Sequence, residues 1–288
     1  MNRKFFLLYL GLNLVILFLI PSTSYTQEEL TQANSDWKVE EFTLPGGTNG
    51  NLVTAISEGP NGYMWFGSFA GLHRYDGHET ITYNESRAVD TTLTTTGLTF
   101  PSIEHLFWDS KGQLWISTFG GGAFHFDPHT EVFTRFLHDP EDPTTINNDF
   151  VHGAAEDADG NIWFATRTGA SKLDQTTGTF KHYKTDPCKP LTDQNNRVRA
   201  LYLDKQGTLW ATAGEVYQAA LIGGLFKYNP STDTFDGYFP NPDKEGGLGH
   251  APIQGMYEDS DGNFWIGTFY GLQRMDRRTG TFLSLIHI

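Results

Sequence analysis

Short apolar segments separated by turn residues run along most of the chain, and the pattern recurs about every 50 residues. Five tryptophans, each three residues after a glycine, mark this recurrence: Trp65, Trp115, Trp163, Trp210 and Trp265. A second glycine follows each tryptophan, four residues before an apolar side chain and an Asp or Asn. A repeat of this length is typical of solenoids, propellers and related arrays.

The third copy, residues 151–183, shows the repeating unit most clearly. An extended segment ends at Asp157, and Asp159-Gly160 then predicts a tight hairpin turn. The segments NIWFAT, ASKLD and TFKHY follow, separated by Gly169 and by the turn at 176–178. No helical period is present, so the unit is predicted to be a four-stranded antiparallel blade.

The five copies predict an all-β protein, a β-propeller of four-stranded antiparallel blades. The blades are expected at 51–83, 101–136, 150–183, 197–239 and 251–288, after a lead-in at 27–50 with a lone outer strand at 37–44. The fifth copy already has its own fourth strand, so the lone strand is surplus to it. We therefore expect an incomplete, open part of a seven-bladed propeller, with a closed five-bladed ring as the alternative. Because an open arc exposes unpaired blade faces, we also expect poor solubility.

Several recurring residues are expected to be structural. The tryptophans should fill the space between blades, and the glycines should supply positive φ at turns. A small residue two positions after each tryptophan should fit a face crossed closely by the next blade; these are Gly67, Ser117, Ala165, Thr212 and Gly267. A basic residue on each third strand should lie over the blade face; these are Arg74, His125, Lys172, Lys227 and Arg274. The runs at 157–160 and 259–262 resemble calcium loops but lack the required glutamate, which favours turn chemistry.

The N-terminus predicts export. Arg3 and Lys4 precede an apolar run at 5–20 and then a stretch of small residues, the order of a secretory signal peptide, here placed at 1–26. The run is short for a membrane span, although an uncleaved anchor is the alternative. We expect a periplasmic location. The single cysteine, Cys188, excludes an internal disulfide and a thiolate metal site.

The charge limits the partners. The formal net charge is −14, and residues 1–26 hold two positive and no negative side chains, so the remainder carries −14 − 2 = −16. Such an acidic body disfavours nucleic acid, anionic lipid and heavily sulfated glycans as general partners, without excluding a local basic pocket. The ten histidines show no zinc-site spacing, and no nucleophile-elbow motif is present. We expect no metal and no cofactor.

Segments 159–166 and 261–268, together with Gly71–Asp76, resemble the two-component regulator propeller repeat. The fourth copy departs most, with Ala213 in place of the usual threonine and extra residues before Gly224. The resemblance implies the periplasmic sensor region of a hybrid or sensor histidine kinase that responds to oligosaccharides. It also implies a downstream β-sandwich, membrane helix and kinase domains in the same parent chain, with a homodimer as an option. The parent would be a histidine protein kinase, whereas the residues present are predicted not to be an enzyme.

Two sets of side chains vary within the fixed frame and are candidate ligand-binding residues. The first follows the initial apolar residue of each inner strand and should ring the channel: Thr54, Glu104, His152, Arg199 and Gln254. Glu104, His152 and Arg199 could hydrogen-bond a hydroxylated ligand. The alternative is a water-filled channel with mutual ion pairing.

The second set begins the loop between the second and third strands, four residues after each tryptophan. It comprises Phe69, Phe119, Arg167, Gly214 and Phe269, with Tyr270 adjacent. The aromatic rings could stack on sugars or pack on neighbouring loops. An insertion at 213–222, with Glu215 and Tyr217, enlarges this loop in the fourth repeat, and the link at 84–100 is another candidate rim element.

Three hypotheses follow. The first is an extracytoplasmic sensor segment that recognises a carbohydrate fragment. The second is a secreted propeller enzyme, a polysaccharide lyase or glycosidase, in which Glu104 and Glu215 could act as paired carboxylates and His152 or His250 as a base. The third is a scaffold for protein contacts.

Overall fold

The computed structural model describes residues 7–10, 13–16, 43–44, 52–83, 102–189, 194–214, 223–251, 253–268 and 270–285. Contacts divide the chain into two compact units, Met1–Phe42 and Thr43–Ile288. In the first unit, β1 (Leu7–Leu10) and β2 (Asn13–Ile16) form an antiparallel hairpin. The rest of the predicted signal peptide, residues 37–42 of the predicted lone strand, and the link at 84–100 lie outside the described residues. Within the described part of the chain, no helix has the length and apolar character needed to cross a membrane.

The second unit contains five four-stranded antiparallel sheets, each with its strands in sequence order. The first sheet is β3 (Val53–Glu58), β4 (Met64–Ser68), β5 (Gly71–Tyr75) and β6 (Thr80–Tyr83). The second is β7 (Ile103–Trp108), β8 (Leu114–Thr118), β9 (Ala123–Asp127) and β10 (Val132–Phe136). The third is β11 (Val151–Glu156), β12 (Ile162–Thr166), β13 (Gly169–Asp174) and β14 (Thr179–Tyr183). A short 3-10 turn, η3 (Gln194–Asn196), precedes the fourth, which is β15 (Val198–Leu203), β16 (Leu209–Ala213), β17 (Gly224–Asn229) and β18 (Thr234–Tyr238). The fifth is β19 (Ile253–Glu258), β20 (Phe264–Thr268), β21 (Gly271–Asp276) and β22 (Thr281–Ser284).

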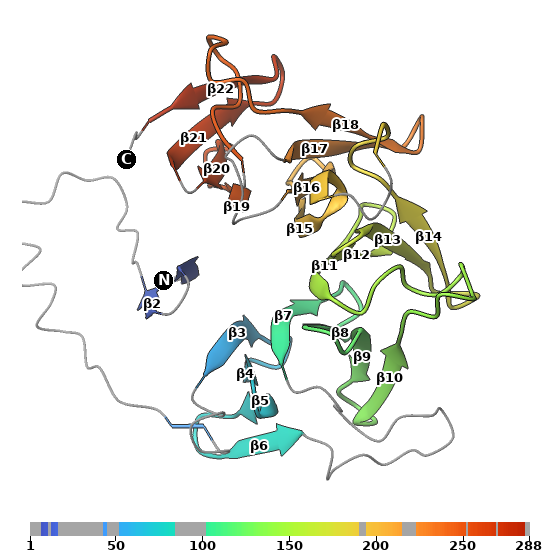
Figure 1. Cartoon of the computed structure of the whole chain (residues 1–288). Coiled ribbons are helices and arrows are strands. Elements are labelled where there is room, and N and C mark those ends of the chain that lie inside the picture. The colour runs from blue at the N-terminus through green and yellow to red at the C-terminus, as the bar shows by residue number, and fades with distance from the viewer. Residues whose placement is uncertain are drawn as a thin grey trace, which may run out of the picture. The chain divides into compact units, whose positions relative to one another are not determined.

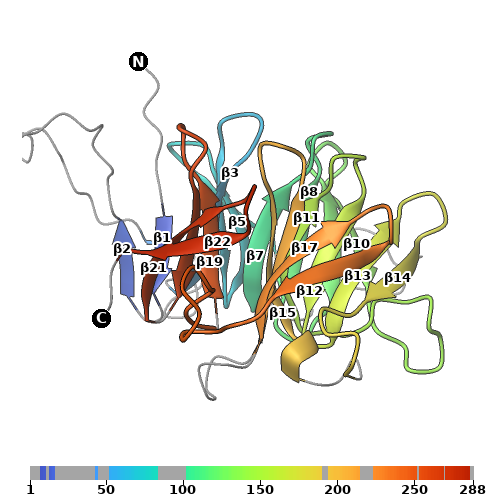
Figure 2. The same ribbon diagram turned by 90° about the horizontal axis from the view of Figure 1, so that it is seen from above.

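The sheets are arranged as propeller blades. Figure 1 shows them following one another in an arc, with β3, β7, β11, β15 and β19 along its inner side. Figure 2, turned by 90°, shows successive sheets packed face against face. The all-β propeller predicted from the sequence is thereby confirmed. Seven as the full number of blades stays a prediction.

The repeating tryptophans fill the space between blades, as expected. Trp65 lies 5.6 Å from Phe126 of the second blade, measured between ring centroids, and Trp115 lies 5.6 Å from Phe164 of the third. Trp210 lies 5.1 Å from Phe264 of the fifth. These tryptophans therefore face the following blade, and Phe164 and Phe264, which adjoin Trp163 and Trp265, face the preceding one.

In the first and third blades the basic residue of the third strand lies over the tryptophan opposite it, which supports its structural interpretation. The Arg74 guanidinium is 5.9 Å from the Trp65 ring, and the Lys172 ammonium is 5.3 Å from the Trp163 ring. Lys172 also lies 3.6 Å from the Asp157 carboxylate. These cations cover the edge of the inter-blade core.

An aspartate that the sequence analysis treated only as a turn residue anchors four of the five tryptophans. Its carboxylate accepts the indole N–H at 2.7–2.9 Å in the pairs Asp109–Trp115, Asp157–Trp163, Asp204–Trp210 and Asp259–Trp265. In the third blade the same carboxylate also accepts backbone N–H groups of Asp159 and Asn161. Burial alone would raise the pKa of Asp157, but the hydrogen bonds from Trp163 and Asn161 and the charge of Lys172 lower it. The hairpin-turn carboxylate thus has a structural role.

Glycine conformation agrees with the repeat frame. The hairpin-turn glycines have positive φ, as at Gly160 (φ 81°). The later glycine marks the entry into the third strand, as Gly169 and Gly224 do at the first residues of β13 and β17. In the fourth blade the positive φ lies one residue earlier, at Gly223 (φ 100°).

Outer strands are joined by tyrosine–carboxylate pairs. The Tyr83 hydroxyl donates to Glu131, and the Tyr183 hydroxyl donates to Asp233, at 2.7 and 2.8 Å. Glu131 and Asp233 have φ of 56° and 55°, a left-handed conformation that glycine adopts in the same turn of the third and fifth blades. The inter-blade hydrogen bond offsets this backbone cost.

The two ends of the arc present uncovered blade faces in the described part of the chain. Glu156 and Glu258, at the ends of their inner strands, accept the N–H of Ser110 and Lys205 in the preceding blade, at 2.7 and 2.8 Å. Glu58 has the same position in the first blade but is exposed. At the other end, Trp265 is only half-buried, whereas the other four repeat tryptophans are at most 4% exposed. This agrees with the open propeller expected from the sequence.

Candidate ligand-binding site at the channel

Every inner strand carries a β-bulge at the same place. The pairing with the second strand shifts register between the first and third residues of β3, β7, β11, β15 and β19. The residue left unpaired in each case is one of the five predicted channel residues: Thr54, Glu104, His152, Arg199 and Gln254. Bulges re-aim side chains and are frequent at binding sites. The five blades therefore present a variable side chain from one structurally equivalent position.

The second predicted set lies at the same end of the blades. Backbone N–H groups of Phe119, Arg167 and Gly214 donate to the carbonyls of Ser102, Phe150 and Arg197, which directly precede the inner strands, at 2.9–3.0 Å. We call this end, with the starts of the inner strands and the connections between second and third strands, the loop end. Described members of both candidate sets thus lie at this end of the blades.

Glu104 and His152 form a hydrogen-bonded pair across the second and third blades. His152 Nδ1 lies 2.8 Å from Glu104 Oε2, and the two side chains are 7% and 30% exposed, respectively. An ionised carboxylate only accepts, so Nδ1 is the donor and, in the neutral ring, Nε2 is an acceptor. Nε2 is buried and makes no hydrogen bond within the described structure. An unmatched buried acceptor of this kind is costly until a donor reaches it.

His105 lies next to this pair and is held neutral. Burial lowers the pKa of His105 to about 4. Its Nδ1 accepts the backbone N–H of Ala154 in the third blade at 3.4 Å, which leaves Nε2 as the protonated nitrogen. The neutral imidazole therefore packs between blades and adds no charge to the site.

The remaining bulge residues differ in their hydrogen bonding and exposure. The Thr54 hydroxyl lies 3.1 Å from the carbonyl of Gly67 and also contacts the carbonyl of Ile103, so it joins two blades. Gln254 is exposed, and Arg199 is half-buried with no hydrogen bond or ion pair to any described residue. Pairing between channel residues, the alternative to ligand binding, is therefore seen for Glu104 and His152 but not for Arg199.

The rim aromatics are both packed and exposed. Phe119 meets Phe150 edge-on, with centroids 4.8 Å apart, yet is 52% exposed. Tyr270 lies 4.6 Å from His250 and is 44% exposed, and Phe69 is 43% exposed. Ring surface is therefore accessible at the loop end. The candidates Glu215, Tyr217 and Phe269 lie outside the described residues.

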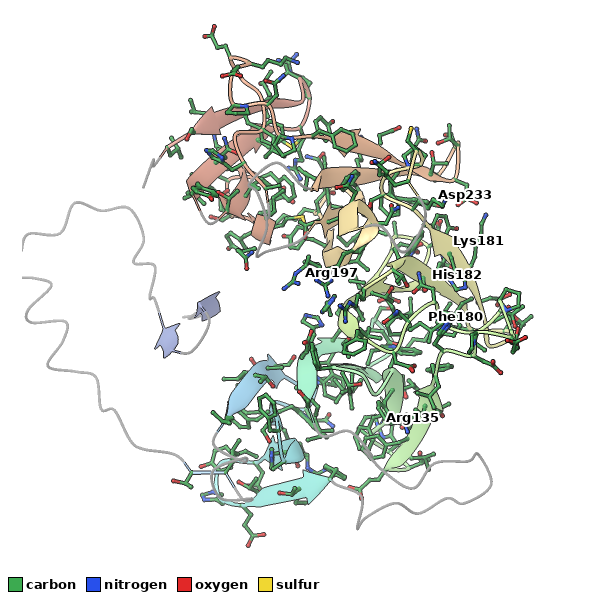
Figure 3. All side chains as sticks on the ribbon, in the orientation of Figure 1. Arg135, Phe180, Lys181, His182, Arg197 and Asp233 are labelled. Atoms are coloured by element: carbon green, nitrogen blue, oxygen red, sulfur yellow. The ribbon has the colours of Figure 1, made fainter. Side chains whose placement is uncertain are left out.

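The residue directly before each inner strand lies outside both predicted sets of site residues. Phe150 carries Phe119 on its ring edge and the Arg167 guanidinium 5.2 Å from its centroid. Arg197 occupies the equivalent position before β15, at the inner side of the arc (Figure 3). Extending the repeat frame by one residue toward the N-terminus would have found both. Within the described residues, no group of three or more His, Cys, Asp or Glu side chains could hold a metal ion.

Three segments of the chain match the family described as two component regulator propeller: residues 145–168, 192–214 and 247–270. Each segment contains the inner strand and the second strand of one blade. No curated protein matches the chain at a significant level.

Solved structures show the same fold. One is the extracellular domain of a protein described as a hybrid two-component system of B. thetaiotaomicron, with 24% identity and a TM-score of 0.64. The match covers 81% of this chain and 30% of that domain, so the chain spans less than a third of its relative. A second such domain from B. thetaiotaomicron has 22% identity and a TM-score of 0.60, over 85% of this chain and 32% of its own. Virginiamycin B lyase from Staphylococcus aureus has 14% identity and a TM-score of 0.59, over 86% and 73% of the two chains.

Proposed function

We propose, from the two-component regulator propeller repeats that the chain carries, that it is the ligand-sensing propeller of a two-component sensor outside the cytoplasm. It binds a carbohydrate fragment at the loop end of its channel. The parent chain continues into a β-sandwich, a membrane helix and kinase domains, which signal across the membrane, and acts as a homodimer. The propeller segment binds its ligand without turning it over.

The observation that carries this proposal is the Glu104–His152 pair. Its Nε2 acceptor is buried at a bulge on the inner side of the blades and lacks a donor among the described residues. A ligand hydroxyl is a donor of the right kind. Because Glu104 fixes the ring orientation, the acceptor is already in place before the ligand arrives, which reduces the entropic cost of binding.

The loop-end aromatics support a sugar over other hydroxylated ligands. Phe69, Phe119 and Tyr270 expose ring surface on three blades, at the end of the blades where the inner strands begin. Carbohydrate sites combine apolar ring faces, which contact sugar C–H groups, with a few placed polar groups that fix orientation. The chain offers both at one end. The match to the two component regulator propeller family, and two structural relatives that are extracellular domains of two-component systems, support the sensory role.

A secreted enzyme acting on polysaccharide is the second candidate, and the same pair of residues favours it. An imidazole held by a carboxylate through Nδ1, with Nε2 free, is the arrangement of a general base. One structural relative is a lyase, although at 14% identity it shows the fold alone. The distinguishing property is product formation.

The test is calorimetric titration of the protein with a panel of oligosaccharides, with chromatographic analysis of each mixture for products. We expect saturable binding of at least one oligosaccharide, no products, and a loss of affinity of about tenfold or more in His152→Ala. His129→Ala, which changes an exposed histidine in the turn between β9 and β10 at the other end of the second blade, is the matched control and should bind normally. Binding by no member of the panel would contradict the sensor function. Products that disappear in His152→Ala would establish the enzyme instead.

A further inference from the structure

We propose that the carbohydrate carries an acidic group, a carboxylate or a sulfate, and that this group pairs with Arg199. The inference rests on the proposed function and narrows its ligand to short acidic oligosaccharides.

The five bulge positions carry one acid and one arginine. Glu104 is the one acid among the five, and its carboxylate is engaged by His152 at 2.8 Å. Arg199 is the one arginine, and no carboxylate of the described residues lies within ion-pair distance of it. Among the bulge residues, Glu104 therefore has a charge partner within the described structure, whereas Arg199 does not.

The other acids of the inner strands lie at the opposite end of the blades. They are Glu58, Glu156 and Glu258, each the last residue of its strand. Glu156 is bound by Ser110, and Glu258 is bound by Lys205 and by Arg277 at 2.7 Å. The described inner strands thus bring no second carboxylate to Arg199.

Further guanidinium groups lie at the loop end of the third and fourth blades. Arg167 begins the loop after β12 and is exposed, and Arg197 directly precedes β15 at the inner side of the arc (Figure 3). With Arg199 on β15, three arginines come from the loop end of the third and fourth blades. The planar guanidinium forms paired hydrogen bonds with carboxylate and sulfate oxygens, which favours an anionic group as their ligand.

The acidic body of the protein limits how much negative charge the ligand can carry. A formal net charge of −14 repels polyanions at long range. At physiological ionic strength this repulsion is screened beyond about 8 Å, whereas a direct contact with Arg199 is screened far less. A short oligosaccharide with one or a few acidic groups satisfies both conditions, and a long, densely sulfated chain does not.

The experiment compares acidic oligosaccharides with their neutral counterparts by calorimetric titration. The probes are short uronate oligomers, the same oligomers with methyl-esterified carboxylates, sulfated oligosaccharides and their desulfated forms. We expect the acidic form of at least one pair to bind about tenfold or more tightly than its neutral form, because a charge-assisted hydrogen bond is lost with the charge. The pair that shows this difference identifies carboxylate or sulfate as the group.

Variants test the residue. In Arg199→Gln the acidic and neutral forms should bind equally, because the charge that separates them is gone. Arg199→Lys should retain part of the preference. Arg278→Gln, which removes an exposed cation in the turn between β21 and β22 at the other end of the fifth blade, should behave as wild type.

Three outcomes overturn the inference. If the neutral forms bind as well as the acidic forms, the acidic ligand is excluded while the sensor function stands. If Arg199→Gln keeps the full preference for acidic over neutral forms, the acidic group binds to another residue. If no oligosaccharide of either kind binds to wild type, the proposed function itself fails. Should Arg199→Gln not fold, salt dependence in wild type remains decisive, since charge pairing requires that the preference for the acidic form weaken as salt rises.

Discussion

At the scale of single residues, the aspartate that accepts the tryptophan N–H joins the hairpin turn to the inter-blade core. In the third blade, Asp157 is buried and receives N–H groups from Trp163, Asn161 and Asp159. Removing it leaves the buried indole N–H and the turn amides without an acceptor. Such losses are larger than the loss of an exposed hydrogen bond.

We therefore predict that Asp157→Ala lowers the free energy of unfolding by about 2 kcal/mol. Urea denaturation followed by tryptophan fluorescence measures it. Asp159→Ala changes an exposed aspartate in the same turn and serves as the control, with little expected effect. Equal midpoints for the two variants would show that the indole bond contributes nothing.

Asp233 predicts a pH dependence at the outer rim of the arc, where it lies beside Lys181 (Figure 3). Burial alone would raise its pKa, but hydrogen bonds from Lys181, Tyr228 and Tyr183 lower the pKa of Asp233 to about 2, from an ordinary value of 3.8. A carboxyl whose pKa is lower in the folded state stabilises the fold above its unfolded pKa. That contribution is lost as the pH falls through the folded value.

The stability advantage of wild type over Asp233→Asn should thus be full above about pH 4 and vanish toward about pH 2. Asparagine also tolerates the left-handed backbone, so the variant isolates the charge. Urea midpoints of both proteins across this range provide the measurement. An advantage independent of pH would mean that the carboxylate charge plays no part.

The sequence predicted residue positions better than residue partners. It placed Glu104, His152 and Arg199 at one repeat position, and the structure puts all three on equivalent bulges. It could not predict that Glu104 pairs with His152, because the pairing depends on how side chains lean between blades. The repeat pattern also did not predict the hydrogen bond from the Trp163 indole to Asp157, because that bond forms only in the folded hairpin.

At the scale of elements, the small residue after each tryptophan allows neighbouring strands to approach. A Cβ added at Gly67 would lie 2.5 Å from Ile103 Cγ2 of the second blade. At Gly267, the equivalent position of the fifth blade, the nearest atom is 3.8 Å away. At this repeat position, the first blade thus requires glycine, whereas the fifth blade has room for a larger side chain.

Gly67→Ala should therefore destabilise the protein by about 1–3 kcal/mol through overpacking, whereas Gly267→Ala should be neutral or slightly stabilising. Chemical denaturation of the two single variants tests this. The idea of close blade approach fails if both substitutions have the same effect.

Element positions followed from the sequence where turn chemistry is strong. Asp-Gly turns and aromatic second strands predicted β11 to β14 within a residue or two. In the fourth repeat Gly224 begins β17 as expected, and the positive φ of the preceding turn falls on Gly223. Residues inserted into a loop do not alter the strand pattern, so the pattern alone cannot tell which glycine makes the turn.

At the scale of the whole molecule, the two uncovered blade faces are complementary. The first blade exposes the side that elsewhere receives a tryptophan, and the fifth blade exposes the side that elsewhere supplies one, with Trp265 half-buried and Leu285 48% exposed. Contacts of this head-to-tail kind propagate when they do not close into a ring.

We predict that residues 27–288 self-associate as their concentration rises, and that Leu283→Lys with Leu285→Lys reduces this association. Sedimentation velocity over a range of concentrations measures it. Leu137→Lys, which changes another exposed leucine away from the fifth blade, is the control and should leave association unchanged. A monodisperse, cooperatively melting wild type would instead favour a closed five-bladed ring.

The central claim is that a carbohydrate binds at the loop end through the buried acceptor of His152. The most direct measurement is a crystal structure of the protein with an oligosaccharide that binds in calorimetry. The account predicts a sugar hydroxyl within hydrogen-bond distance of His152 Nε2, with Glu104 still on Nδ1. A sugar bound at the opposite end of the blades, with His152 Nε2 unchanged, would contradict it.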